Sequence, residues 1–168
     1  MRKTRDSIVE LSVDAIVNAA KETLRGGGGV DGSIQRKAGP GLLEECRRFH
    51  GCRTGDAKIT GGYCLAGKHI IHPVGPVWRG AENGEAELLT SSDRRSLEIA
   101  VVNGVRTVAI PAISCGVYHF PEEAAAVLGV GEVKRFLEVE ERELEAIWFV
   151  CFTDGVTAAY EALFEVHG

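Results

Sequence analysis

Residues 15–20 read AIVNAA and residues 25–32 read RGGGGVDG, and these two stretches set the architecture of the chain. The apolar run predicts a buried strand, and the glycines allow the backbone after it to turn tightly. An amphipathic helix is predicted from Ser33 to Phe49, with Ile34, Ala38, Leu42 and Cys46 at helical spacing. Gly39-Pro40-Gly41 interrupts this pattern, so we expect a kink or two separate helices.

The alternation of strand and helix continues along the chain. Further strands are predicted at 57–65, 69–74, 107–112 and 146–152, and further helices at 87–103, 121–137 and 156–166. Strands that alternate with helices predict an α/β fold, in which a largely parallel or mixed sheet is covered on both faces. No internal repeat or linker divides the 168 residues, which is the size of one domain.

The charge balance disfavours some classes of partner. The chain has 24 acidic and 19 basic residues, a net charge of −5, whereas a general nucleic-acid binder needs a basic face. No apolar run is long enough to span a bilayer. Met1 to Asp6 carry charge with no apolar core behind them, which is not the pattern of a secretory signal. We therefore expect a cytoplasmic protein with no membrane partner.

The five cysteines are expected to be reduced thiols. Their odd number and wide spacing are typical of cytosolic core cysteines. Cys46, His50 and Cys52 form the one cluster that resembles metal ligands, but it supplies three ligands and no second pair follows. Two semi-buried thiols are favoured over zinc, so we expect neither a metal nor a cofactor.

The first glycine-rich loop has the features of an anion site. Backbone N–H groups ahead of a helix point toward a bound anion, and glycines allow that anion to come close. Gly27, Gly29 and Gly32 match GxGxxG, but no acidic residue ends a strand about 20 residues later, as the dinucleotide fingerprint requires. No Gly-Lys-Ser/Thr follows either, which excludes a Walker A loop.

A second loop of the same kind is SCGVYHFP at 114–121, which follows a buried strand and precedes a helix. Either loop alone is better explained by an ordinary tight turn. Two such loops at the carboxyl ends of strands predict one crevice between them. A nucleotide diphosphate gripped by both loops is the predicted occupant.

Polar residues beside the loops offer catalytic groups. Asp31 is a candidate general base that activates a water near bound phosphates, or else a helix N-cap. Asn18 either bonds a ribose hydroxyl or holds the loop backbone. His72 and His119 are interpreted as structural, with His119 the better candidate for acid–base work because it lies in the loop.

Aromatic residues are candidates for contact with a sugar and a base. Tyr118 and Phe120 are placed to stack on a sugar or to wall it off, and Phe152 is placed to pack on a base. Because aromatics at strand ends more often belong to the core, this interpretation depends on the two loops.

Four stretches together resemble one known family. VDAIVNAAK at 13–21, GGGGVDGSIQRKAGP at 26–40, CRTGDAKITGGYCLAGKHIIHPVGP at 52–76 and AIPAISCGVYHFP at 109–121 resemble the macrodomain family. The resemblance is to its MacroD-type branch, which includes bacterial O-acetyl-ADP-ribose deacetylases. It implies a single macrodomain over residues 1–168, with a three-layer α/β/α fold, a mixed central sheet and an ADP-ribose cleft.

The resemblance also implies roles for individual residues. In such enzymes the aspartate of the glycine loop, here Asp31, activates a water with help from the substrate diphosphate. The ADP-ribose contacts that carry over to this sequence are Gly28, Gly29, Val30, Gly32, Ser114, Cys115, Gly116, Val117, Tyr118 and Phe152.

Three departures from the family pattern affect the expected site. Lys21 stands where the family has a catalytic asparagine, and lysine donates hydrogen bonds but accepts none. Near the N-terminus, Asp6-Ser7-Ile8 stands for Gly-Asp-Ile, so either Asp6 or Ser7 is expected at the adenine, after a first strand that is short or missing. His119 occupies a usual glycine position, which costs energy if the position needs a positive φ.

These observations leave three functional hypotheses. The favoured one is a hydrolase that removes mono-ADP-ribose from Asp and Glu of proteins and acetyl from O-acetyl-ADP-ribose, with Asp31, Lys21 and Asn18 as catalytic residues. The alternative is a reader that binds ADP-ribosylated proteins without turnover, because Lys21 replaces the asparagine. A nucleic-acid-end module is disfavoured by the net charge. A monomer is expected.

Overall fold

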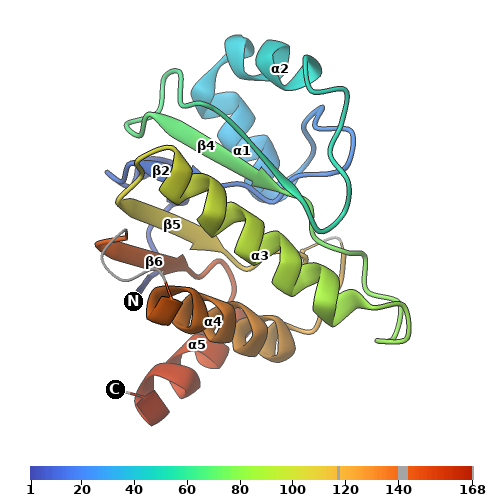
Figure 1. Ribbon diagram of the computed structural model, residues 1–168, viewed down its shortest axis with the longest axis vertical. Coiled ribbons are helices and arrows are strands. Elements are labelled where there is room, and N and C mark those ends of the chain that lie inside the picture. The colour runs from blue at the N-terminus through green and yellow to red at the C-terminus, as the bar shows by residue number, and fades with distance from the viewer. Residues whose placement is uncertain (117, 140–143, 168) are drawn as a thin grey trace.

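The strands form one mixed sheet in the computed structural model, which describes residues 1–116, 118–139 and 144–167 (Figure 1). They are β1 (Arg2–Thr4), β2 (Ala15–Val17), β3 (Ala57–Gly61), β4 (His69–Pro73), β5 (Thr107–Pro111) and β6 (Ala146–Val150). Their order is β1-β6-β5-β2-β4-β3, and only β3 and β4 pair antiparallel. The predicted mixed sheet is confirmed, and its first strand is short.

Helices cover both faces of the sheet. They are α1 (Gly29–Ala38), α2 (Pro40–Arg47), α3 (Glu85–Val102), α4 (Glu122–Val139) and α5 (Asp154–His167), with a short 3-10 helix, η1, at Ile8–Glu10. Successive side chains of β2 point to opposite faces of the sheet. Ala15 and Val17 belong to the core under α3 to α5, and Ile16 belongs to the core under α1 and α2. This confirms the three-layer fold. No helix in the described part of the chain is long and apolar enough to cross a membrane.

Several element boundaries differ from the predicted ones. The strand predicted over 15–20 ends at Val17, although the N–H groups of Asn18 and Ala20 still donate to carbonyls of β4. The first helix begins at Gly29 rather than Ser33. It is separated from α2 by Gly39, whose φ of 95° is in the left-handed region that glycine adopts readily. Helix α3 begins at Glu85 rather than at residue 87. The buried carboxylate of Glu85 accepts hydrogen bonds from the N–H groups of Ala81 and Asn83 in the preceding loop.

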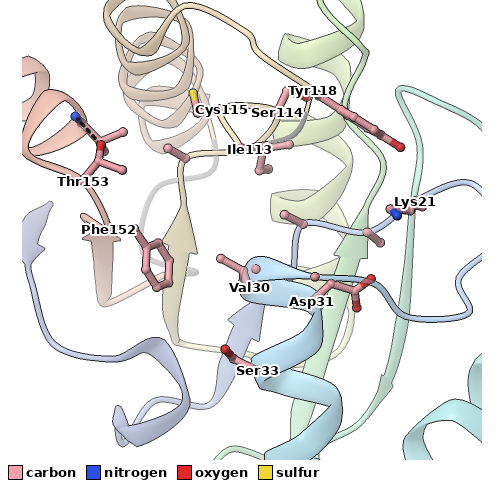
Figure 2. Close-up of a pocket in the computed structure, with 18 of the residues that line it drawn as sticks. Lys21, Val30, Asp31, Ser33, Ile113, Ser114, Cys115, Tyr118, Phe152 and Thr153 are labelled. Carbon is pink, nitrogen blue, oxygen red and sulfur yellow. Dashed lines mark hydrogen bonds between the residues drawn. The ribbon is translucent and has the colours of Figure 1, made fainter.

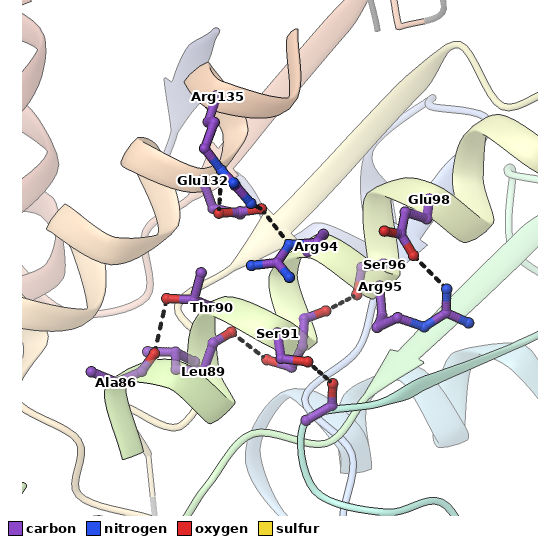
Figure 3. A network of polar contacts seen from close by, with 12 residues as sticks. Ala86, Leu89, Thr90, Ser91, Arg94, Arg95, Ser96, Glu98, Glu132 and Arg135 are labelled. Carbon is purple, nitrogen blue, oxygen red and sulfur yellow. Dashed lines mark hydrogen bonds and ion pairs between the residues drawn. The ribbon is translucent and has the colours of Figure 1, made fainter. Parts of the chain in front are cut away.

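An ion pair between Arg94 and Glu132 joins α3 to α4 (Figure 3). The carboxylate of Glu132 accepts hydrogen bonds from Arg94 at 3.0 Å and from Arg135 at 2.9 Å. Burial raises the pKa of Glu132, but the two arginines outweigh it and hold the pKa below its usual value. Asp93 lies beside this pair, and a Cβ on Gly129 would lie 3.6 Å from its carboxylate. Burial, together with the charge of Glu132, raises the pKa of Asp93 to about 7.

Asp93→Asn is expected to stabilise the protein at alkaline pH. A carboxyl with a raised pKa favours the folded state while it is protonated and loses that contribution as pH rises toward its folded pKa, here about 7. The variant should gain about 1–3 kcal/mol in free energy of unfolding at pH 8, with little difference at pH 4. Urea denaturation of both proteins from pH 4 to 8 measures this. A difference that does not grow with pH would contradict the assignment.

Candidate active site

A cavity of about 520 Å³ opens at the carboxyl ends of the parallel strands. It lies between the loop that follows β2 and the loop that follows β5, two neighbouring strands of the sheet. After β2 the chain forms β3 and β4 on one side of it, whereas β5 and β6 lie on the other side, so the cavity sits at a topological switch point. The crevice predicted between the two glycine-containing loops is therefore present.

The N-terminus of α1 forms one wall of the cavity. Gly28 is the N-cap, and Gly29 has a φ of 58°, which favours glycine. The first N–H groups of a helix have no partner within the helix, so this wall can bind an anion. Gly32 does not line the cavity, contrary to the expected ligand contact. A Cβ at this position would lie 2.6 Å from the carbonyl oxygen of Gly27, so the glycine allows the helix to pack on its own loop.

The loop after β5 forms the opposite wall. Ser114 lies here with a φ of 66°, and its buried hydroxyl has no hydrogen-bond partner among the described residues. The hydroxyl packs on Gly75, where a Cβ would lie only 2.1 Å from it. Cys115 and Gly116 also line the cavity. Burial, the largest cause, and the charges of Glu122 and Asp93 raise the pKa of Cys115 to about 12, so the side chain is a neutral thiol. Val117 lies outside the described residues.

His119 has a φ of 58°, so the position does require the left-handed conformation. A histidine there costs about 1 kcal/mol relative to glycine. Its side chain is not among those that line the cavity. Phe120 is also turned away from the cavity and packs against Trp78 in the core, with ring centroids 4.9 Å apart. These two residues shape the loop from outside the site.

The Asp31 carboxylate is held by a chain of buried polar groups. The Asn18 amide donates to Asp31 at 2.9 Å and to Nδ1 of His72 at 3.1 Å, and its oxygen accepts the N–H of Ala19 at 2.7 Å. Burial lowers the pKa of His72 to about 4, so the ring is neutral. Because Nδ1 faces an amide donor, Nε2 carries the proton and donates to Thr60 at 2.9 Å. Every hydrogen-bonding group of Asn18 is thereby used within the protein.

This network corrects the expected role of Asn18. The side chain is completely buried and does not line the cavity, so no group of it is left for a ribose hydroxyl. The alternative, that Asn18 holds the loop, agrees with its bond to Ala19. Its further bond to Asp31 makes it the residue that sets the position of the carboxylate.

Asp31 and Lys21 lie together at one end of the cavity (Figure 2). A Cβ on Gly27 would lie 3.2 Å from the Lys21 ammonium and 3.5 Å from the Asp31 carboxylate, so the two groups share the space over that glycine. Burial raises the pKa of Asp31, and hydrogen bonds from Asn18 and Gln35 and the charge of Lys21 oppose this rise without cancelling it. Such a carboxylate is a stronger base than a solvated one. Asp31 is not an N-cap, since it lies in the first turn of α1.

The two ends of the cavity differ in character (Figure 2). Phe152, which is 48% exposed, lies at one end, with Val30 and Ser114 between it and the charged end. Tyr118 lies at the charged end, where burial and then the charges of Glu22 and Asp31 raise its pKa. An apolar ring at one end and a carboxylate with an ammonium at the other suit an elongated ligand with an aromatic and a polar terminus.

The N-terminal residues expected near the ligand do not line the cavity. Asp6 instead accepts a hydrogen bond from the Thr4 hydroxyl at 2.9 Å. Ser7 is exposed, and Ile8 is buried in the core under α1 and α2. Neither Asp6 nor Ser7 lines the cavity, because β1 ends at Thr4 and the chain turns into the core at η1, and the contact of either residue with the ligand stays a prediction.

The structure adds cavity residues that the sequence analysis missed. Gly75 follows β4 and lies within residues 52–76, one of the stretches that resemble the macrodomain family. The resemblance could therefore have identified it as a cavity residue. The same signal was available for six more residues that lie in the other quoted stretches, namely Ala19, Ala20, Ser33, Arg36, Ala112 and Ile113. Glu122, Thr153 and Val156 lie outside these stretches and gave no local signal, because only the packing brings them to the cavity.

Comparisons with known proteins place this fold and cavity in one family. The sequence model of the Macro domain matches residues 17–128. A Macro domain-containing protein of Methanosarcina mazei is 58% identical over 145 residues, which are 86% of this chain and 77% of the relative. This chain belongs to the Macro domain family.

Two relatives have names that state an activity. The O-acetyl-ADP-ribose deacetylase of Citrobacter rodentium is 47% identical over 165 residues, covering 96% of this chain and 93% of the relative. The human ADP-ribose glycohydrolase MACROD2 is 50% identical over 151 residues, but these are 89% of this chain and 36% of that protein. Their similarity agrees with the MacroD-type resemblance.

A solved structure has the same fold. The Trypanosoma brucei macrodomain in complex with ADP-ribose superposes with a TM-score of 0.90 at 39% identity, over 96% of this chain and 68% of that one. The macrodomain fold expected from the sequence is thus confirmed.

Asn18→Ala is expected to lower the free energy of unfolding by about 2–4 kcal/mol, because it leaves a buried carboxylate and a buried imidazole without their shared donor. Thr60→Val is the matched control, since it removes only neutral hydrogen bonds, those with His72 and the Gly61 carbonyl, and should lower the free energy of unfolding by about 1–2 kcal/mol. Urea denaturation of both variants measures the difference. Equal losses would mean that Asn18 has no special part in the network.

Proposed function

We propose that this chain binds ADP-ribose and hydrolyses ADP-ribosyl esters, with mono-ADP-ribosylated Asp and Glu side chains and O-acetyl-ADP-ribose as substrates. The proposal rests mainly on Asp31, a buried carboxylate with a raised pKa at the polar end of an elongated cavity. The names of the Citrobacter rodentium deacetylase and of MACROD2 support the same chemistry.

The ligand is proposed to lie along the cavity with its adenine on Phe152. The exposed ring offers an apolar surface on which a base can stack. The diphosphate then lies between the N-terminus of α1 and the loop after β5, where helical N–H groups favour an anion. The unpaired hydroxyl of Ser114 is a donor for a phosphate oxygen at the same level. The distal ribose reaches Tyr118, Lys21 and Asp31.

The proposed reaction consumes one water. Asp31 accepts a proton from the water, whose oxygen attacks the ester carbonyl carbon. The bond between that carbon and the ribose oxygen then breaks, and Asp31 returns the proton to the ribose oxygen, which leaves a carboxylic acid and a free ribose hydroxyl. The substrate diphosphate helps to position the water. Asn18 fixes the carboxylate through its hydrogen bond and makes no contact with the substrate. The ammonium of Lys21 supplies positive charge next to the reacting groups, where negative charge develops in the transition state.

A second candidate function follows from Lys21 itself. Its side chain occupies the place at which the family resemblance expects a catalytic asparagine, and lysine cannot accept a hydrogen bond from a ribose hydroxyl. If turnover needs that acceptor, the protein is a reader that binds ADP-ribosylated proteins and releases nothing. We favour the hydrolase because Asp31 and its buried support are present together.

Asp31→Ala is expected to lower the rate of ester hydrolysis at least about 100-fold while changing the dissociation constant for ADP-ribose only a few-fold. The measurement is release of label from a protein mono-ADP-ribosylated on Glu or Asp, with calorimetry for ADP-ribose. Asp154→Ala, which removes an exposed aspartate outside the cavity, serves as the control. Binding without release by the wild-type protein would establish the reader instead.

Lys21→Met is expected to shift the acidic side of the pH–rate profile to higher pH. Hydrolysis needs ionised Asp31, and the charge of Lys21 lowers the pKa of that carboxyl, so its removal raises the pKa further. The rate should therefore fall more at pH 5 than at pH 8. Lys21→Asn, which restores the asparagine, is measured alongside. An unchanged profile in Lys21→Met would show that the ammonium does not act on Asp31.

A further inference from the structure

A second concave surface borders the active site on the side of the reacting groups. This basic groove has a volume of about 370 Å³ and is formed by Glu22, Thr23, Arg25, Arg47, His50 and Gly51. It joins the loop after β2 to the segment that follows α2. The two segments touch through their backbones, since the N–H of Cys52 donates to the carbonyl of Glu22 at 2.8 Å.

The basic groove lies next to the polar end of the cavity. Lys21 lines the cavity, and Glu22, the next residue, lines the groove. Glu22 also lies near enough to Tyr118 to raise the pKa of that phenol, although burial is the larger cause. A chain attached to a ligand at Asp31 and Tyr118 therefore leaves the cavity beside the groove.

The charges of the groove are not balanced within the protein. Arg25 and Arg47 are exposed, and neither forms an ion pair in the described part of the chain. Glu22, the acid of the groove, accepts the Thr54 hydroxyl at 2.6 Å and is held at the groove wall. Because acidic residues outnumber basic ones in this sequence, two arginines left unpaired in one concave surface are available to an acidic partner.

We propose that the basic groove binds an acidic segment of the ADP-ribosylated protein, next to the modified side chain. The proposal rests on the proposed function, because it needs the modified residue to sit at Asp31. A guanidinium binds a carboxylate through two parallel hydrogen bonds, so Arg25 and Arg47 select aspartate or glutamate near the modification. The groove then distinguishes among modified proteins, which the cavity itself cannot do.

An acidic peptide fits this surface better than a nucleic acid does. A nucleic acid carries a phosphate at every step, and binding it requires a continuous basic face. The groove holds two arginines together with the carboxylate of Glu22, on a chain with a net charge of −5. Separate carboxylates on flexible side chains can pair with the arginines and avoid Glu22.

The test compares two peptides that each carry one mono-ADP-ribosylated glutamate. One has aspartate and glutamate on both sides of the modified residue, and the other has serine there. The wild-type protein should hydrolyse the acidic peptide with a kcat/KM about three- to tenfold higher. Arg25→Glu combined with Arg47→Glu should abolish or reverse this preference and leave the rate on O-acetyl-ADP-ribose unchanged. Lys134→Glu, a charge reversal on α4, should keep the preference.

A preference that survives in the double variant would overturn the proposal, as would an equal loss on both peptides and on O-acetyl-ADP-ribose. The proposal would also be overturned if an RNA oligonucleotide inhibited hydrolysis of the modified acidic peptide more strongly than an unmodified acidic peptide does. That result would favour a nucleic-acid partner. If the wild-type protein hydrolyses neither peptide, the proposed function fails. The groove is then tested by the dissociation constants of the same two peptides, in which the same preference and its loss are expected.

Discussion

One buried amide connects the sheet to the reactive carboxylate. Asn18 lies just beyond the end of β2, and its NH₂ group donates both to Asp31 on α1 and to His72 on β4. Its oxygen accepts the next backbone N–H, so the orientation of the amide is fixed, with two partners for the NH₂ group and one for the oxygen. The position of Asp31 is thus determined by the rigid central strands, although the residue itself lies at the start of a helix after a glycine-rich loop.

Burial shifts the pKa values of the two ionisable groups in this network, His72 and Asp31, in opposite directions. It lowers the pKa of His72, which keeps the ring neutral and able to accept from Asn18. It raises the pKa of Asp31, and the nearby charge of Lys21 limits that rise. A neutral imidazole behind the carboxylate and a cation beside it therefore leave the carboxylate basic yet ionisable. This balance suits a group that takes a proton from water.

Close approach of backbones shapes the rest of the cavity. Gly75 lets the loop after β5 pack against the end of β4, and Gly32 lets α1 pack against its own loop. Around the polar end, the same loop after β2 contributes Lys21 to the cavity and Arg25 to the basic groove. The proposed chemistry and the proposed choice of substrate therefore involve one short segment, a few residues apart, while α2 supplies the second arginine of the groove.

The sequence alone determined the order and type of the main strands and helices, the two glycine-containing loops and Asp31 as the candidate base, while the short first strand was expected from the family resemblance. The strands, helices and loops follow from hydrophobic periodicity and from the backbone freedom of glycine, which are local properties. Only the tertiary structure decided that Asn18 turns inward, that Asp6 and Ser7 do not line the cavity, and that Arg25 and Arg47 line one groove. The direction of a side chain and its neighbours depend on how distant segments pack, and no local pattern encodes that packing.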